Sequence, residues 1–426
     1  MEKEGKKPLC FGTDGVLALC GEELERAAYA LGRTVSGSVV LGRDTRVSGA
    51  RLARVFAEGA CAAGARVTDV GVMPTAGVAY LTKSRGANFG AVISASHNPP
   101  EYNGIKIFSA AGEKLSESEE NRFNAALSMQ FERTSVALDV TDAPLGARED
   151  YIKGLTQAGH GLAGMKIALD CANGAAGVIA PEVFARLGAD TVTVSANIGG
   201  EDINDGCGAL HVETLKKRCP GKFDLYCAFD GDADRLMALD ERGEVMDGDR
   251  IMFTIAALAI QKGKKIPCVA GTVMSNGGTE RAFAKLGVRF LRAKVGDKYV
   301  KRMMDECGAP MGGEQSGHII LSEHAGTGDG ILTAVVLASL LKEAGRSASE
   351  FSYPVFPQFN ASVVTEDKER AKSAQTAALA KKWEERGVRV LVRHSGTEPK
   401  IRVMTECESA DLAKAALDEL ESKLLG

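Results

Sequence analysis

One pattern recurs three times along this 426-residue chain: an apolar strand, a short polar loop and a helix that ends at a glycine. The predicted strands are residues 39–41, 166–170 and 267–271. The glycines that end the predicted helices are Gly64, Gly188 and Gly287. A strand followed by such a helix is half of a βαβ unit, so the repeat predicts three similar α/β domains. The chain length also favours several domains, because single hydrophobic cores do not grow this large.

The C-terminal part of the chain has a different pattern. After a connection that contains Pro354 and Pro357, we expect a β-α-β-β-α order of elements. The expected elements are residues 360–364, 368–386, 388–392, 401–404 and 411–425. This order predicts a small α+β domain that closes the chain. The expected domains are therefore residues 1–147, 148–245, 246–350 and 351–426.

The composition is that of an ordinary soluble protein, with 45% hydrophobic and 25% charged residues. A net charge of −4 without a long basic run argues against a nucleic-acid partner. The longest apolar runs, 251–260 and 331–341, are shorter than the roughly 20 residues that a bilayer needs, and no signal-like stretch follows the N-terminus. Ten cysteines without CxxC pairs predict reduced core thiols and no zinc site. We therefore expect a cytoplasmic protein without membrane contact.

Each repeat leads into a second strand, and a small polar loop follows that strand. The loops are residues 94–99, 230–235 and 313–318. Because α/β sheets bind ligands at strand ends, three such loops suggest one shared cleft.

Asp230, Asp232 and Asp234 alternate in the second loop, directly after the apolar run 225–229. Three carboxylates so close together would repel one another, and a divalent cation with oxygen ligands relieves that repulsion. Mg²⁺ is favoured, because it is held by few carboxylates together with phosphate oxygens. A calcium EF-hand is not favoured, since Arg235 stands where that loop needs glycine. The remaining alternative is a surface turn of solvated acids.

The other two loops carry candidates for phosphoryl transfer and for sugar binding. The serine-containing loop places a hydroxyl at a strand end, where it could carry a phosphoryl group and share the cation; the alternative is an ordinary Ser/Asn turn before Pro99. Lys106 and His318 could each act as general acid or base, or be a solvated lysine and a core histidine. Glu314 and Ser316 suit vicinal sugar hydroxyls, or form only a polar turn.

A further polar turn lies between the last two predicted strands. Its donors are Arg393, Ser395, Gly396, Thr397 and Arg402. Two guanidiniums, two hydroxyls and a glycine amide would suit a phosphate group. The alternative is a hairpin turn with incidental arginines.

Five motifs together resemble the α-D-phosphohexomutases, in order and over essentially the whole chain. The motifs are residues 11–15, 94–99, 230–235, 313–318 and 395–399. Within that family the segments Gly12–Gly15 and Glu314–His318 are most similar to the phosphoglucosamine mutase branch, and the segments 327–330 and 274–276 fit the same branch.

The resemblance implies three α/β domains and a fourth, TATA-box-binding-like domain around a central cleft. It implies that Ser96 carries the phosphoryl group and shares one Mg²⁺ with the three aspartates, while Arg235 offsets charge on the transferring group. It further implies that Glu314 and Ser316 hold the sugar and that the 393–397 turn holds the non-reacting phosphate.

The expected reaction is the interconversion of glucosamine 6-phosphate and glucosamine 1-phosphate through a 1,6-bisphosphate, for amino-sugar nucleotide supply. Hexosamine or glucose 1,6-bisphosphate is the expected priming donor, and a monomer or homodimer the expected assembly. The alternatives are a phosphoglucomutase or phosphomannomutase, or a sugar-phosphate binder with little or no turnover.

Two departures from the family pattern bear on activity. Leu17-Ala18 stand where family members carry Arg-Gly, so a guanidinium expected near the reacting phosphate is absent. His394 replaces the proline that precedes Ser395, which alters the rigidity of the phosphate turn or adds a donor.

Overall fold

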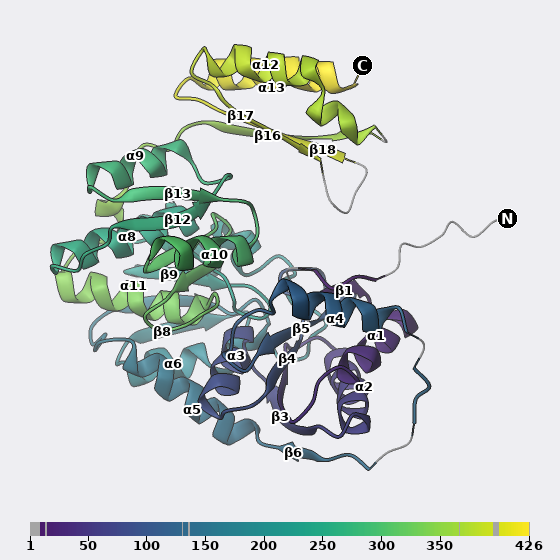
Figure 1. Cartoon of the computed structure of the whole chain (residues 1–426). Helices are drawn as coiled ribbons and strands as arrows, with labels where there is room; N and C mark the ends of the chain where they lie inside the picture. The colour runs from purple at the N-terminus through teal and green to yellow at the C-terminus, as the bar shows by residue number, and fades with distance from the viewer. Residues whose placement is uncertain are drawn as a thin grey trace. The chain divides into compact units, whose positions relative to one another are not determined.

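The computed structural model describes residues 9–12, 15–129, 131–134, 137–365, 367–394 and 400–425. These residues form two compact units: residues 1–274 with 290–352, and residues 275–289 with 353–426. Figure 1 traces the elements along the chain. Four sheets follow one another in the sequence.

The first sheet has the order β1-β5-β4-β2-β3-β6. Its strands are β1 (Val16–Leu19), β2 (Ser38–Arg43), β3 (Arg66–Val72), β4 (Phe89–Ile93), β5 (Tyr102–Ser109) and β6 (Val140–Asp142). The helices of this part of the chain are α1 (Glu22–Gly32), α2 (Gly49–Ala62), α3 (Thr75–Ser84), α4 (Glu117–Leu127) and α5 (Pro144–Gln157). Strand β4 is parallel to β2 but antiparallel to β5, so the loop after β4 returns along a neighbouring strand.

The second sheet has the order β11-β10-β9-β7-β8. Its elements are β7 (Lys166–Asp170), α6 (Ala180–Arg186), β8 (Asp190–Val194), α7 (Val212–Arg218), β9 (Leu225–Phe229), β10 (Leu236–Asp240) and β11 (Val245–Met246), with 3₁₀ turns at Ala175–Val178 and Ala209–His211. Every residue of the central strand β9 is buried. The apolar run 225–229 is therefore a core strand that ends at the aspartate loop.

The third sheet has the order β13-β12-β14-β15. The elements along this part of the chain are α8 (Gly248–Gln261), β12 (Cys268–Thr272), α9 (Gly277–Lys285), β13 (Arg289–Ala293), α10 (Asp297–Cys307), β14 (Met311–Gly313), β15 (Ile319–Leu321), α11 (Gly330–Ala344) and a 3₁₀ turn at Ala348–Phe351. The loop between β14 and β15 carries Glu314 and His318.

The last sheet is antiparallel, with the order β16-β18-β17. Its elements are β16 (Gln358–Val364), a 3₁₀ turn at Lys368–Lys372, α12 (Ala374–Glu384), β17 (Arg389–His394), β18 (Lys400–Glu406) and α13 (Ala410–Leu425). This unit has its own core, in which Val363, Ile401 and Val403 pack against Leu417 and Leu420.

The three repeats are confirmed at the level of their elements, because each predicted strand and the helix after it are present. The prediction of one helix over 368–386 was wrong. Ser373 interrupts it, since its hydroxyl accepts a bond from the Thr376 amide and caps α12. The prediction of core thiols was also wrong for Cys10, Cys20 and Cys307, which are exposed.

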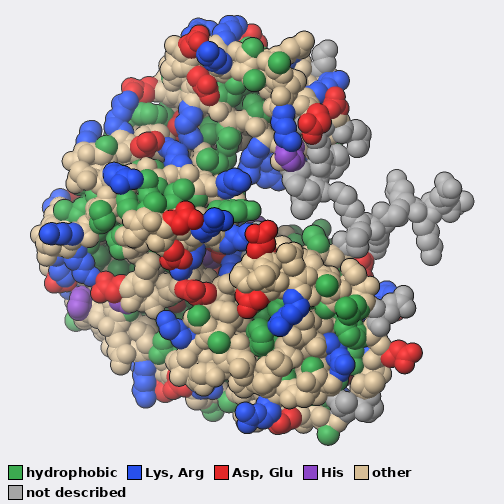
Figure 2. Space-filling model, viewed as in Figure 1, with side chains coloured by type: hydrophobic (Ala, Val, Ile, Leu, Met, Phe, Trp, Pro, Cys, Tyr) green, Lys and Arg blue, Asp and Glu red, His purple; other side chains and the backbone are tan. Residues whose placement is uncertain are grey.

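The surface seen in Figure 2 mixes basic and acidic side chains with polar and hydrophobic ones. This mixture agrees with a net charge close to zero for a chain of this size. Among the helices of the described residues, none combines the length and the apolar character needed to cross a membrane.

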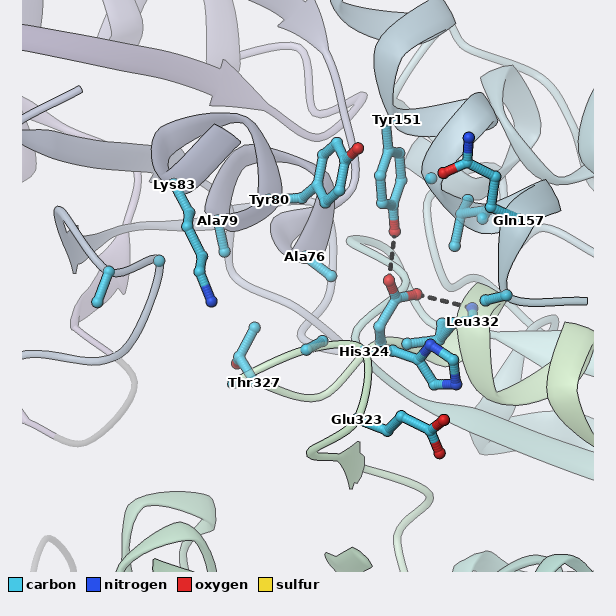
Figure 3. A pocket seen from close by; sticks show the side chains of 18 residues that line it. Ala76, Ala79, Tyr80, Lys83, Tyr151, Gln157, Glu323, His324, Thr327 and Leu332 are labelled. Carbon is cyan, nitrogen blue, oxygen red and sulfur yellow. Dashed lines mark hydrogen bonds between the residues drawn. The ribbon is translucent and has the colours of Figure 1, made fainter. Parts of the chain in front are cut away.

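A buried hydrogen bond joins helix α5 to the residue that caps helix α11. The Tyr151 hydroxyl on α5 donates to Asp329 Oδ2 over 2.7 Å, and Asp329 Oδ1 accepts from the Leu332 amide as the cap of α11. Figure 3 shows Tyr151 beside Tyr80, at a cavity of about 270 Å³. Burial raises the pKa of Asp329 to about 6, although the Leu332 amide and the Tyr151 hydroxyl act in the opposite direction.

We predict that Tyr151→Phe lowers stability by about 1–3 kcal/mol, because Asp329 loses a buried donor. The folded pKa of Asp329 is raised, so its contribution to stability is complete below its unfolded pKa and is lost as the pH rises through about 6. Removing the Tyr151 donor raises this pKa further, so the loss of melting temperature should be larger at about pH 8 than at about pH 4. Thermal unfolding at the two pH values measures this difference.

The control is Tyr80→Phe, because the Tyr80 ring lies 5.8 Å from that of Tyr151 and its hydroxyl bonds to none of the described residues. This variant should unfold like the wild type. Equal melting temperatures for Tyr151→Phe and the wild type at both pH values would contradict the prediction.

Candidate active site

The serine loop begins where β4, an inner strand of the first sheet, ends. Ser96 has a φ of 51°, a left-handed conformation that serine rarely adopts, so the loop needs outside support to hold it. In this conformation the buried Ser96 hydroxyl donates to Asp230 Oδ2 over 2.7 Å. The structure therefore brings the serine of the first repeat and the aspartate loop of the second into direct contact.

The support for the serine loop comes from the buried guanidinium of Arg46. It donates to the carbonyls of Ser96 (2.9 Å), Asn98 (2.7 Å) and Tyr102 (3.0 Å). Asp44 accepts from Arg46 Nε over 3.0 Å, and this pair is fully buried. Several carbonyls that converge on one guanidinium fix the backbone of the loop, because the five donors of arginine have a rigid planar geometry.

The loop is also held from the second part of the chain. The Asn204 side-chain amide donates to the Ser96 carbonyl over 2.9 Å, and the Thr45 hydroxyl donates to the Asn173 carbonyl over 2.6 Å. These bonds cross between the first and second sheets. They set the position of Ser96 relative to the aspartates.

The three aspartates are buried, with exposed fractions of 0%, 0% and 5% for Asp230, Asp232 and Asp234. Between them lies Ala233, whose φ of 57° turns the loop back on itself. One ligand oxygen from each carboxylate lies within 4.8 Å of the others. A solvated surface turn, the alternative that the sequence left open, does not describe a trio this deeply buried.

The hydrogen bonds leave two carboxylate oxygens of the trio unused. Asp232 Oδ2 accepts from Thr75 and Lys106, and Asp234 Oδ2 accepts from Lys106. Asp232 Oδ1 and Asp234 Oδ1 are buried and accept no hydrogen bond from the described residues. Buried charged oxygens without donors are costly, so they are suited to a hard divalent cation. Together with Asp230 and the Ser96 hydroxyl they form an oxygen-rich donor set that fits Mg²⁺.

The pKa values of Asp230 and Asp234 move in opposite directions. Burial, together with the neighbouring carboxylates of Asp234 and Asp232, raises the pKa of Asp230 to about 8. Burial also acts to raise the pKa of Asp234, but Lys106 and His318 outweigh it and hold this pKa well below its usual range. Such separation is the expected result when like charges share a buried site.

A chain of alternating charges leads from the aspartates to His318. His318 Nδ1 lies 3.7 Å from Asp234 Oδ2, and Nε2 lies 3.2 Å from Asp297 Oδ2. Asp297 Oδ2 in turn lies 2.5 Å from Lys114 Nζ. Burial lowers the pKa of His318, but Asp297 and Asp234 outweigh it and raise this pKa to about 10. The ring therefore lies between two carboxylates, and the Gly328 amide nitrogen lies 3.2 Å from Nε2.

Glu314 and Ser316 lie on the loop between β14 and β15, where Glu314 is half-buried and Ser316 is exposed. Glu314 Oε1 accepts from the Gly296 amide over 2.8 Å, one residue before Asp297. The start of α10 therefore orients both Glu314 and His318.

The segment 327–330 holds the aspartate loop from the side of α11. The Gly330 amide donates to the Ala233 carbonyl over 3.0 Å, and a side chain at position 330 would come within 2.2 Å of the Arg235 carbonyl. A Cβ at Gly328 would lie 2.3 Å from His318 Nε2. Positions 328 and 330 therefore require glycine, because neighbouring atoms lie too close for any side chain. This explains the pattern Thr-Gly-Asp-Gly at residues 327–330.

Family models match successive parts of the chain. They describe phosphoglucomutase/phosphomannomutase alpha/beta/alpha domains I, II and III at residues 9–133, 149–243 and 247–359, and the C-terminal domain at 360–423. The phosphoglucosamine mutase of Caldanaerobacter subterraneus subsp. tengcongensis is 42% identical over 97% of this chain and 99% of its own length. That of Moorella thermoacetica is 45% identical over 93% of this chain and 94% of its own length. The chain belongs to the α-D-phosphohexomutase family.

Solved phosphohexomutases share the fold. A phosphoglucomutase/phosphomannomutase family protein from Burkholderia thailandensis superposes with a TM-score of 0.78 at 23% identity, covering 96% of this chain and 95% of that one. The Aspergillus fumigatus N-acetylphosphoglucosamine mutase in complex with GlcNAc-6P and magnesium gives 0.73 at 19% identity, covering 98% and 96%. The expected fold class, three α/β domains and a C-terminal domain, is confirmed. Phosphohexomutases are magnesium-dependent, and the buried aspartates of this chain could hold such an ion.

The phosphate turn expected of a phosphohexomutase lies in the second unit. Arg393 and Arg402 are paired in register on β17 and β18, so their side chains emerge on the same face of the sheet. Ser395, Gly396 and Thr397 lie outside the described residues, as do Thr13 and Asp14 of the first motif.

The residue that departs from the phosphohexomutase pattern lies close to the serine loop. Leu17 is 42% exposed on β1 and is paired with Gly104 on β5. The Gly104 carbonyl accepts from the Ser94 amide over 3.0 Å. A longer side chain at position 17 therefore has room and lies one strand away from the serine loop.

Sequence reasoning missed Arg46, Thr75 and Asp297. Arg46 belongs to the polar loop of the first repeat, to which no role was assigned, and that unexplained loop is the signal that could have identified it. Thr75 and Asp297 gave no such signal, because each acts by contacting a residue that is far away in the sequence.

We predict that Asp232→Asn weakens Mn²⁺ binding by more than about 100-fold, because the variant removes a charged ligand from the cation site. Electron paramagnetic resonance titration of free Mn²⁺ measures the affinity. The control is Asp205→Asn, which changes an exposed acid on the 204–205 loop and should leave the affinity unchanged. Equal binding by the two variants would place the cation elsewhere.

Proposed function

We propose that this protein is a phosphoglucosamine mutase, an isomerase that interconverts glucosamine 6-phosphate and glucosamine 1-phosphate. The observation that carries the proposal is the contact of the Ser96 hydroxyl with Asp230 in a buried trio with two unused oxygens. Two phosphoglucosamine mutases support the choice of substrate, because their sequences are 42% and 45% identical to this chain over nearly its whole length.

Substrate binding is assigned to two groups of residues. Arg393 and Arg402, with the turn that carries Ser395, Gly396 and Thr397, would grip the phosphate that does not react, through charge-assisted hydrogen bonds. Glu314 and Ser316 would hold the sugar hydroxyls. Because Glu314 is fixed by the Gly296 amide, its position does not depend on the substrate.

Phosphoryl transfer begins from phosphorylated Ser96. The attacking sugar hydroxyl forms a new bond to phosphorus, the bond between phosphorus and Ser96 Oγ breaks, and the proton of the sugar hydroxyl passes to a base. The product is a 1,6-bisphosphate; it turns over in the site and returns its other phosphate to Ser96, which releases the isomeric monophosphate. Bound Mg²⁺ supplies positive charge to the transferring group.

Three cationic side chains assist this transfer. Lys106 Nζ lies 2.6 Å from Asp232 Oδ2, and His318 Nδ1 lies 3.7 Å from Asp234 Oδ2, so either would exchange a proton with a sugar hydroxyl bound at the aspartates. Arg235 Nε lies 3.9 Å from both Asp230 and Asp234, where its charge offsets that of the phosphoryl oxygens.

The remaining parts of the proposal concern the cellular setting. Hexosamine or glucose 1,6-bisphosphate would prime Ser96, and the product would supply amino-sugar nucleotide and cell-wall precursors in the cytoplasm. We propose a monomer or homodimer with domains at residues 1–147, 148–245, 246–350 and 351–426.

The proposal predicts that the enzyme, primed with glucose 1,6-bisphosphate, converts glucosamine 6-phosphate at least about tenfold faster than glucose 6-phosphate or mannose 6-phosphate. A coupled assay with the three sugars measures kcat/KM. A preference of similar size for glucose or mannose would favour a phosphoglucomutase or phosphomannomutase instead.

Ser96→Ala is the control for this assay, because it removes the oxygen that carries the phosphoryl group. Intact mass spectrometry should find one phosphoryl group on the primed wild-type chain and none on the variant. An unphosphorylated wild-type chain that also ignores sugar bisphosphates would instead indicate a non-catalytic binder.

The Leu17 departure gives a separate prediction. Leu17→Arg should raise kcat/KM by roughly tenfold, because a guanidinium near the serine loop would stabilise charge on the reacting phosphate. Leu19→Arg is the matched control, since Leu19 is also exposed on β1 and is paired with Tyr102 instead of Gly104. Unchanged turnover in Leu17→Arg, or an equal rise in Leu19→Arg, would contradict the role assigned to this position.

A further inference from the structure

Helix α3 contacts the aspartate loop at its first residue. The Thr75 amide donates to the Asp232 carbonyl over 3.0 Å, and the Thr75 hydroxyl donates to Asp232 Oδ2 over 2.5 Å. Thr75 is 2% exposed, so neither bond competes with water. Two bonds from one residue fix both the backbone and the side chain of Asp232.

The hydroxyl bond determines which oxygen of Asp232 is available. Oδ2 accepts from Thr75 and from Lys106 Nζ, over 2.5 and 2.6 Å. Oδ1 is buried and accepts no hydrogen bond from the described part of the chain. Since the carboxylate is planar, holding Oδ2 against α3 also fixes the direction of Oδ1.

One flank of helix α3 borders a cavity. Ala76, Ala79 and Tyr80 on this helix line the cavity of about 270 Å³ that Figure 3 shows. Side chains next to a cavity lack contacts on that side, so this flank of the helix contributes less packing than its buried face. The two bonds at Thr75 therefore join α3 directly to the aspartate loop.

We propose that Thr75 is a positioning residue for the metal site, which holds Asp232 so that Oδ1 faces the cation. The inference rests on the proposed function, because it needs the aspartates to bind a divalent ion. Groups that orient metal ligands typically contribute 10–100-fold to metal affinity. Thr75 has this role although its hydroxyl is neutral and contacts no substrate.

The test is Mn²⁺ binding to the full-length protein, measured by electron paramagnetic resonance. Thr75→Val keeps the shape of the side chain and removes the hydroxyl, so the affinity should fall by roughly 10–100-fold. Thr75→Ser keeps the hydroxyl, and its affinity should stay within about threefold of the wild type.

Thr82→Val is the matched control. Thr82 is a fully buried threonine on the same helix, and its hydroxyl donates to the Val78 carbonyl over 2.7 Å, away from the aspartates. Thr82→Val should bind Mn²⁺ like the wild type, while circular dichroism compares the folding of all variants.

The outcomes separate the inference from the proposed function. Wild-type affinity in folded Thr75→Val, equal weakening in Thr82→Val, or failure of Thr75→Ser to restore binding would each overturn the positioning role and leave the mutase proposal intact. A wild-type protein that binds no Mn²⁺ would overturn both. If Thr75→Val does not fold, the test rests on Thr75→Ser. A roughly 10–100-fold loss of Mn²⁺ affinity in folded Thr75→Ser, which keeps the hydroxyl, would overturn the role of the hydroxyl.

Discussion

The mutual repulsion of three buried carboxylates is the constraint on which the rest of this site depends. Asp230, Asp232 and Asp234 lie at the end of a buried strand, where water cannot screen their charges. Without a cation, the protein relieves part of the repulsion through Lys106 and through a raised pKa of Asp230. The oxygens that remain without donors define the place where a divalent ion reduces the electrostatic cost most.

The scaffold holds this unfavourable arrangement because the loops of three sheets support one another. Arg46 and Asn204 hold the Ser96 carbonyl, and the Gly330 amide holds Ala233. Each of the two loops contains a left-handed residue, Ser96 in one and Ala233 in the other. Backbone strain of this kind persists only where surrounding contacts over-determine it, so the contacts between the loops are part of the candidate active site.

Much of this site was visible in the sequence. The alternation of the aspartates after an apolar run predicted a cation site at a strand end, and the threefold repeat predicted loops at comparable positions. The two strands on either side of the turn that follows Arg393 were also expected. These features were predictable because each depends on residues that are near in sequence, and because strand ends are where α/β folds place ligands. The prediction of one helix over 368–386 was wrong for a local reason. The Ser373 side chain caps a new helix, α12, so the 3₁₀ turn before it does not continue.

By itself, the sequence determined the fold class, the acidic loop and the identity of the residues that carry charge. Only the tertiary structure decided that the Ser96 hydroxyl donates to Asp230 and that Arg46 donates to the carbonyls of the serine loop. It also decided that Thr75 orients Asp232 and that Asp297 orients His318. The physical reason is that hydrogen bonds require partners within about 3 Å, and in this site those partners come from separate sheets and helices. Local patterns fix which groups a loop offers, whereas long-range packing fixes which of their oxygens are left for a ligand.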